Sequence, residues 1–237
     1  MKRFLVSVFA LLFILSSIIV LYFSFHFKGN YTSSSAVSNE FCIIIDAGHG
    51  GEDGGTSAAD GTLEKDINLS IAKYLESILG ASGYRTIMLR NSDEQLGDTN
   101  LPTIRQRKVS DIRTRLKITQ SYPEAIFISI HQNHYTSPKY SGTQVFYSTK
   151  SQYSKMLADS IQNSVTHQLQ PENKRTTKSV GTNIYLLYNC ELPAVMVECG
   201  FMSNPNESEK LKTPDYQKQI AFSIMCGIQN YLEDKDG

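Results

Sequence analysis

The sequence predicts an α/β fold, with a central, mostly parallel sheet flanked by helices on both faces in a single domain. Three short apolar runs, Phe41–Ile45, Ala125–Ile130 and Ala194–Val197, show no polar alternation. Such runs are typical of strands that are buried on both faces of a parallel sheet. Segments with helical spacing of apolar residues lie between these runs, and alternation of strands with helices predicts this layered architecture.

The first strand leads directly into a glycine-rich stretch. Asp46, His49 and five glycines fall within residues 46–55. Glycine allows backbone conformations that other residues avoid. Open α/β sheets bind their ligands just beyond the carboxyl ends of the strands. We therefore expect this stretch to form part of a functional site.

The next segments continue the alternation. Leu63–Leu79 is a predicted helix because apolar residues recur at positions 63, 67, 71, 75 and 78, and Gly80 marks its end. Tyr84–Leu89 is a predicted short strand, and residues 91–102 form a polar surface loop. Ile104–Gln120 is a predicted helix that is strongly basic, and we expect its charges to face solvent.

The second half of the chain follows the same pattern. We expect, in order, a strand at Thr143–Tyr147, a helix at Met156–Leu169, a short strand at Ile184–Leu187 and a final helix at Pro214–Leu232. Pro171 ends the first of these helices, and Pro214 suits the first turn of the second. Asn204 or Asn206 is expected to cap a helical turn before the last helix.

Composition and the amino-terminal segment limit where the protein acts. The 237 residues carry 23 basic and 23 acidic side chains, so net charge does not predict nucleic-acid binding. The uncharged run Phe4–Phe27 is longer than the ~20 apolar residues that span a bilayer. We predict a membrane anchor in residues 1–28, a polar tether in residues 29–40, and export of residues 41–237. A signal peptide cleaved near Ala36–Ser38 is the alternative.

Four polar residues lie where the predicted strands and the first helix meet. His49 and His131 follow two strands, Glu198 follows a third, and Glu64 opens the first helix. Two histidines and a carboxylate are the ligands of a catalytic zinc site, which keeps a fourth position open for water. A second carboxylate can take a proton from that water. From the residues alone either glutamate can be the ligand, and His134 remains an alternative to His131.

Each of these residues also has a structural explanation. His49 could cap backbone groups in its glycine-rich turn, and Glu64 could favour the dipole of its helix. Glu198 is harder to explain in this way, because a carboxylate that ends an apolar strand is costly unless it is paired or bound to a metal. The coincidence of four such residues at one edge of the sheet favours the metal site.

Competing motifs fit less well. The glycine stretch fails as a dinucleotide-binding GxGxxG because Asp53 occupies the third glycine position, and the sequence has neither GK[ST] nor GxSxG. Cys199 could be a nucleophile, but its apolar context favours a buried core residue, as for Cys42. The four cysteines show no CxxC spacing, which argues against a structural zinc knuckle.

Four motifs in order resemble one family. DAGHGGEDGG (46–55), LEKDINL (63–69), SIHQN (129–133) and VECGFMSN (197–204) are similar to motifs of the zinc-dependent N-acetylmuramoyl-L-alanine amidases, which are bacterial cell-wall hydrolases. The similarity runs from about Phe41 to Tyr231. Within the family, the small size, the amino-terminal segment and RKVSDIRTRLKIT (107–119) are most similar to the germination-specific amidases of spore formers.

The resemblance implies roles for the candidate residues. His49, Glu64 and His131 would bind one Zn²⁺, and Glu198 would be the catalytic carboxylate. The implied reaction is hydrolysis of the amide between the lactyl group of muramic acid and L-alanine in peptidoglycan stem peptides. The basic helix, from Arg105 to Lys117, could meet the carboxylates of a stem peptide, although we expect its charges to face solvent. Residues 41–237 would then be a catalytic domain that acts outside the cytoplasm, and modification of the spore cortex is the implied process.

Two positions depart from the family pattern, and two questions stay open. Ala47 stands where the family usually has proline, and His134 stands where it usually has a small residue. Activity could require an accessory protein partner. The alternative function is an exported, zinc-containing peptidoglycan-binding protein without turnover. An intact Glu198 argues against that alternative, because a binding module needs no general base.

Overall fold

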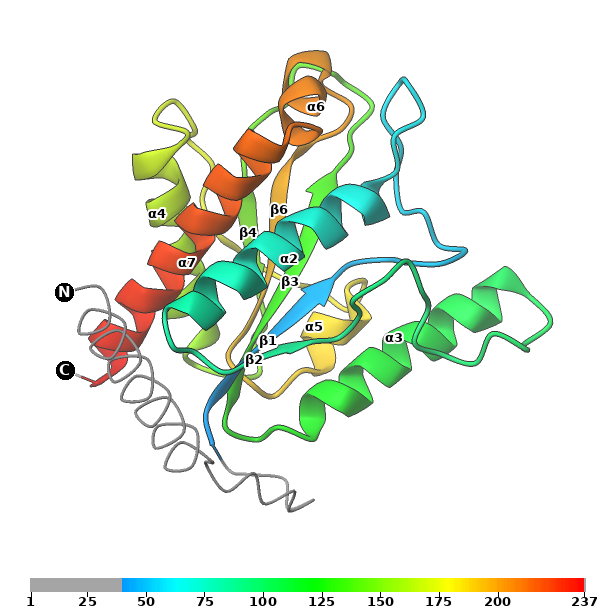
Figure 1. Ribbon diagram of the computed structural model, residues 1–237, viewed down its shortest axis with the longest axis horizontal. Helices are drawn as coiled ribbons and strands as arrows, with labels where there is room; N and C mark the ends of the chain where they lie inside the picture. The colour runs from blue at the N-terminus through cyan, green and yellow to red at the C-terminus, as the bar shows by residue number, and fades with distance from the viewer. Residues whose placement is uncertain (1–39, 237) are drawn as a thin grey trace, which may run out of the picture. The chain divides into compact units, whose positions relative to one another are not determined.

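A six-stranded sheet lies at the centre of the computed structural model, which describes residues 40–236 (Figure 1). Its strand order is β2-β1-β3-β6-β4-β5. The first four of these strands run parallel, whereas β4 runs antiparallel to β6. The bounds are Cys42–Ala47 for β1, Thr86–Met88 for β2, Ala125–Asn133 for β3, Gln144–Tyr147 for β4, Lys178–Ser179 for β5 and Ala194–Phe201 for β6. The predicted mostly parallel sheet is confirmed.

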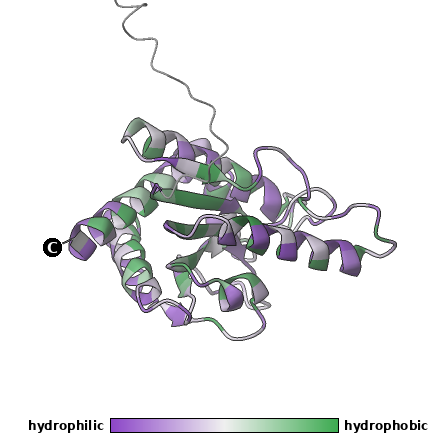
Figure 2. Cartoon of the chain, turned by 90° about the horizontal axis from the view of Figure 1, so that it is seen from below, coloured by the Kyte–Doolittle hydropathy of each residue, from purple (hydrophilic) through white to green (hydrophobic). Residues whose placement is uncertain are grey.

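Helices cover both faces of the sheet, as predicted. One face packs against α2 (Glu64–Ala81), α4 (Ser154–Gln168) and α7 (Pro214–Asp236), and the other against α3 (Ile104–Gln120) and α5 (Tyr185–Asn189). Alternate residues of β1 pack into the hydrophobic cores on the two faces of the sheet, with Ile43 and Ile45 in one core and Cys42 and Ile44 in the other. Figure 2 shows hydrophobic and hydrophilic residues alternating along the helices that surround the sheet.

The register of the parallel strands brings their carboxyl ends to one edge. Asp46 of β1 lies opposite Ser129 of β3, and His131 of β3 lies opposite Glu198 of β6. The pairing of β3 with β6 is irregular just beyond His131. Polar side chains that are far apart in the sequence therefore meet at this edge.

Local signals at the helix ends account for the helix boundaries. At the start of α3, Thr103 and Gln106 form a reciprocal capping box. Asn204 caps α6 (Pro205–Leu211) by accepting a hydrogen bond of 3.1 Å from the Glu207 N–H. The prediction of a cap at Asn204 is therefore confirmed. The bounds of α3 also agree with the predicted helix.

The structure differs from the expectations in two short segments. The predicted strand at Ile184–Leu187 is wrong, because α5 occupies this region and places Leu187 in the second core. A short apolar run without alternation cannot be assigned to strand or helix from its spacing. The predicted strand at Tyr84–Leu89 is present but pairs with β1 over Thr86–Met88 alone.

The predicted membrane anchor lies outside the described residues, as does the tether up to residue 39. Within residues 40–236 no helix combines the length and the apolar content needed to cross a bilayer. Residues 40–236 form one compact unit, which contains the sheet and every helix described above.

Candidate functional site

The loop after β1 passes very close to the candidate residues. A Cβ atom on Gly48 would lie 2.2 Å from the His131 ring, and one on Gly55 would lie 2.5 Å from Glu64 Oε2. His49 has a φ of 63°, a left-handed conformation that costs a non-glycine residue ~1–2 kcal/mol. The loop therefore requires glycine at these two positions, and other contacts must hold His49.

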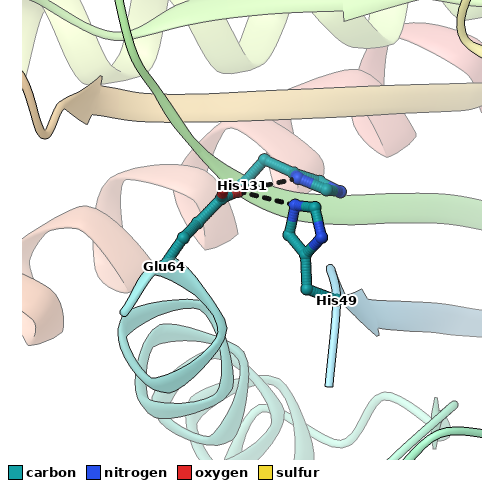
Figure 3. A group of neighbouring side chains, drawn as sticks. All are labelled: His49, Glu64 and His131. Carbon is teal, nitrogen blue, oxygen red and sulfur yellow. Dashed lines mark hydrogen bonds and ion pairs between the residues drawn. The ribbon is translucent and has the colours of Figure 1, made fainter. Parts of the chain in front are cut away.

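Three candidate residues meet in one group, drawn in Figure 3. Glu64 Oε1 lies 3.2 Å from His49 Nε2 and 2.9 Å from His131 Nδ1. The two imidazole rings are 4.9 Å apart at an interplanar angle of 75°. The possible ligand atoms of the group all lie within 4.8 Å of one another, so the group could hold a metal ion.

Glu64 is fixed from several directions. Its Oε2 accepts the Thr56 N–H at 2.9 Å, and its Oε1 accepts the Gln132 N–H at 3.1 Å and the Asn68 side-chain amide at 3.3 Å. Burial alone would raise the pKa of Glu64, but contacts with His131 and His49 hold that pKa well below its usual value. The side chain is therefore an ionised carboxylate with its direction set by the protein.

The His49 ring is oriented through its second nitrogen. His49 Nδ1 lies 2.9 Å from Asp53 Oδ2, which leaves Nε2 directed at Glu64. Burial lowers the pKa of His49, but hydrogen bonds with Asp53 and Glu64 outweigh it and raise the pKa to about 9. A metal ion must displace this proton, since only the neutral ring is a ligand.

Two buried guanidinium groups hold the backbone on either side of His49. Arg115 donates to the carbonyls of Ala47 at 3.0 Å and His49 at 2.7 Å, and it pairs with Asp46. Arg90 donates to the carbonyls of Ala47 at 2.8 Å and Gly48 at 3.1 Å. Three consecutive carbonyls are thus fixed, which stabilises the left-handed conformation of the ligand candidate His49.

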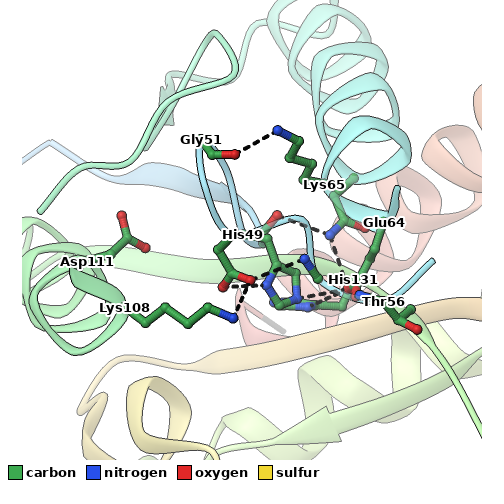
Figure 4. Close-up of polar contacts among 12 residues, drawn as sticks. His49, Gly51, Thr56, Glu64, Lys65, Lys108, Asp111 and His131 are labelled. Carbon is green, nitrogen blue, oxygen red and sulfur yellow. Dashed lines mark hydrogen bonds and ion pairs between the residues drawn. The ribbon is translucent and has the colours of Figure 1, made fainter. Parts of the chain in front are cut away.

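The helix α3 reaches the same loop with further charges, some of which appear in Figure 4. Lys108 Nζ lies 2.7 Å from Asp53 Oδ1, and Arg107 forms two bonds with Glu52 at 2.7 and 2.9 Å. Asp111 accepts from Arg115 Nε at 2.6 Å. The expectation that the charges of this helix face solvent is therefore wrong for the side of α3 that faces the loop.

Glu198 lies beside the group, at the carboxyl end of β6. It lies opposite His131 in the register of β3 and β6, and its Oε2 is buried with no hydrogen-bond partner among the described residues. Burial raises the pKa of Glu198 to about 7, and the Glu64 charge acts in the same direction. A buried carboxylate oxygen without a hydrogen-bond donor indicates a position where a cation, a water or a substrate can bind.

The alternative residues do not join this group. His134 is exposed at the start of the loop after β3 and is not a member of the described metal-binding group. Cys199 is fully buried, and burial raises the pKa of its thiol well above the ordinary value. All four cysteines are free, and Cys42 and Cys199 lie in the core as expected.

Arg115, Arg90 and Asp53 have positioning contacts that sequence reasoning missed. A signal for Arg115 was present, because Asp111, Arg115 and Thr119 recur every four residues and so share one face of α3. No comparable local pattern marked Arg90, whose acceptors are distant carbonyls. Asp53 had the weak signal of being four residues from His49.

Comparison with known proteins agrees with the resemblance found in the sequence motifs. The N-acetylmuramoyl-L-alanine amidase family Amidase_3 matches residues 43–230. The germination-specific N-acetylmuramoyl-L-alanine amidase of Bacillus subtilis (strain 168) is 35% identical over 226 residues, which cover 94% of this chain and 94% of that protein.

Solved structures are similar over the same region. The CwlD amidase of Clostridioides difficile, solved in complex with the GerS lipoprotein, is 39% identical with a TM-score of 0.78 and covers 81% of this chain and 98% of that one. An N-acetylmuramoyl-L-alanine amidase from Clostridium difficile 630 is 28% identical with a TM-score of 0.71, covering 84% and 100%. Because the family match spans the sheet and every residue of the site, the chain belongs to the N-acetylmuramoyl-L-alanine amidases.

Proposed function

We propose that this amidase binds one zinc ion through His49, Glu64 and His131 and uses Glu198 as its catalytic carboxylate. The proposal depends on one observation: three ligand atoms lie within 4.8 Å of one another, beside a buried Glu198 oxygen that has no described partner. The substrate is the amide between the lactyl group of muramic acid and L-alanine of peptidoglycan stem peptides.

The donor set fits zinc. Imidazole nitrogens combined with one carboxylate are typical of catalytic zinc, whereas calcium and magnesium prefer oxygen ligands throughout. Glu64 and His131 come from α2 and β3, and His49 comes from a loop whose carbonyls are fixed. Zinc bound here would polarise the scissile carbonyl and bring the pKa of a water ligand near 7.

The chain's own residues then have separate tasks. Asp53 holds His49 through Nδ1, and the backbone N–H groups of Thr56 and Gln132 hold Glu64. Such outer partners keep ligands in place. Glu198 accepts the proton of the attacking water and returns it to the departing alanine nitrogen, as a general base and then a general acid.

The relatives suggest the setting in the cell. The Bacillus subtilis relative is described as germination-specific, and the Clostridioides difficile relative was solved with a lipoprotein. We infer that this chain acts on spore-cortex peptidoglycan and that an accessory protein contributes to its activity. It acts outside the cytoplasm, held at the membrane by the uncharged run Phe4–Phe27.

Metal analysis and turnover measured on the same samples test this proposal. The full wild-type chain should contain about one zinc per molecule and release L-alanine amino termini from peptidoglycan. His131→Ala should lose both zinc and activity. Glu198→Gln should keep zinc and lose about 10²–10⁴-fold in turnover. His167→Ala is the matched control, because it alters an exposed histidine on α4, outside the metal group.

Four results would contradict the proposal. Full zinc occupancy in His131→Ala would remove His131 from the ligand set, and loss of zinc in Glu198→Gln would place Glu198 among the ligands. Near-normal turnover by zinc-loaded Glu198→Gln would refute the role of this carboxylate. A zinc-loaded wild type that binds peptidoglycan without releasing amino termini would support the alternative of binding without turnover.

A further inference from the structure

A groove of about 430 Å³ opens at the edge of the sheet that carries the metal group. We call it the tyrosine groove, and its walls are residues 57–60, 134–138 and 202–212. The first wall follows Thr56, whose N–H binds Glu64. The second follows β3, which carries His131, and the third follows β6, which carries Glu198. Each wall therefore continues from an element of the metal group.

An exposed aromatic ring stands in this groove on a fixed support. Tyr135 is 53% exposed, and its N–H donates to Ser203 Oγ at 3.0 Å. Its ring packs edge-to-face on Tyr140, with centroids 5.0 Å apart at 89°. Asn204 donates to the carbonyls of Pro138 at 2.9 Å and Tyr140 at 3.3 Å. The ring is therefore preorganised, which lowers the entropy cost of binding a ligand to it.

The charge of the groove disfavours an anionic ligand. Lys212 is the only lysine or arginine among the described lining residues, and it is paired at 2.6 Å with both Asp60 and Glu209. Two carboxylates against one ammonium leave the groove with a net negative charge. A peptide that ends in a free carboxylate is repelled there. An N-acetylated sugar is uncharged and offers a C–H face to an aromatic ring.

The opposite flank of the metal group has the opposite character. On α3, Lys108 lies 2.7 Å from Asp53 Oδ1 beside the metal group, and its side chain is 45% exposed. Arg105 and Arg113 line a groove on the other side of the helix, which faces away from the loop. Carboxylates of a peptide are attracted to the Lys108 side. The two halves of a muramoyl-peptide thus have complementary surfaces on opposite sides of the scissile amide.

We propose that the tyrosine groove binds the glycan of the substrate, with Tyr135 stacked on a sugar ring next to the muramic acid that carries the scissile amide. This proposal rests on the proposed amidase function and deepens it by assigning an orientation to the substrate. The sugars lie between residues 57–60 and 134–138, and the stem peptide extends toward α3. Binding of the glycan here is uniform in the ground and transition states, so it affects KM more than kcat.

Steady-state kinetics with two substrates of identical stem peptide test the proposal. One substrate carries a single N-acetylmuramoyl sugar, and the other carries an extended glycan. Tyr135→Ala in the zinc-loaded full chain should raise KM about 5- to 10-fold for the extended substrate only. Tyr135→Phe should restore the wild-type KM, because the ring is retained. Tyr153→Ala is the matched control, since Tyr153 is 41% exposed but precedes α4, outside the groove.

The outcomes separate this proposal from the proposed function. An unchanged KM for the extended substrate overturns the glycan site, and a rise that follows peptide length instead places the peptide in the groove. A wild type that releases no alanine amino termini refutes the amidase proposal. The glycan site is then judged by equilibrium binding of a peptide-free N-acetylated oligosaccharide, which Tyr135→Ala should weaken by the same factor.

Discussion

The half-buried Glu198 side chain, whose Oε2 is fully buried, should make the metal-free protein less stable as pH rises. Its pKa is raised from 4.5 to about 7, first by burial and then by the Glu64 charge. A carboxyl group whose pKa is raised on folding favours the folded state while it is protonated. This contribution is fully present below about pH 4.5, and it is lost as pH rises through about 7. Glu198→Gln replaces the group with a neutral amide of similar shape and removes the effect.

The size of the effect follows from the pKa difference. A shift from 4.5 to about 7 corresponds to about 3 kcal/mol of unfolding free energy at high pH. The new amide brings donors that also need partners, so we expect Glu198→Gln to stabilise the chelated protein by about 1–3 kcal/mol near pH 8. Near pH 5 the difference should fall below about 1 kcal/mol, because this pH is well below the folded pKa and only about half a unit above the unfolded one.

Urea unfolding in the presence of a chelator, near pH 5 and near pH 8, measures this difference. Glu191→Gln is the control, because it changes an exposed carboxylate and should have little effect at either pH. A stability difference that is the same at both pH values would refute the reasoning. A Glu198→Gln protein that is less stable than wild type near pH 8 would also refute it, since the carboxylate would then have a partner.

Three further predictions concern the metal group and the location of the protein. Arg115→Lys should weaken zinc binding by about 10–100-fold in chelator competition, because Arg115 holds the backbone of His49. The control Arg113→Lys, on the exposed side of α3, should bind zinc as the wild type does. Equal zinc affinities for the two variants would show that Arg115 is not a positioning residue. Zinc affinity should rise about tenfold per pH unit up to about pH 9, because His49 must lose its proton to bind the metal. Asp53→Asn should reduce this dependence of zinc affinity on pH, because Asp53 helps to raise the pKa of His49. The full chain should fractionate with membranes and be cleaved by external protease, whereas an amino terminus at Val37 or Ser38 would show a cleaved signal.

The fold was predictable because its signals are local. Buried parallel strands such as β1 are continuous apolar runs, and α3 has a capping box at Thr103 that marks its first residue. The error at Ile184–Leu187 arose where no local signal exists, since four apolar residues satisfy either a strand or a helical turn. Tertiary contacts of Leu187 with the second core determined the outcome.

The members of the candidate site were predictable, but their support was not. His49, His131 and Glu198 each follow an apolar strand, so the common edge of a parallel sheet was enough to bring them together. Arg90 and Arg115 both donate to backbone carbonyls of the loop. Every residue has such a carbonyl, so the sequence does not show which ones accept these hydrogen bonds. Support of this kind becomes visible only when the path of the backbone is known.

The supporting role of α3 follows from what it buries. Its buried residues are Asp111, Arg115, Leu116 and Thr119, whereas Ile104 and Val109 are 52% and 42% exposed. Apolar burial is non-directional, but Arg115 must satisfy Asp46, Asp111 and two carbonyls in one geometry. A shift of α3 would therefore leave buried charges unpaired and release His49 from its left-handed conformation. The residues of the metal group lie near the strand ends, and the charged face of α3, through Arg115, fixes the conformation of His49.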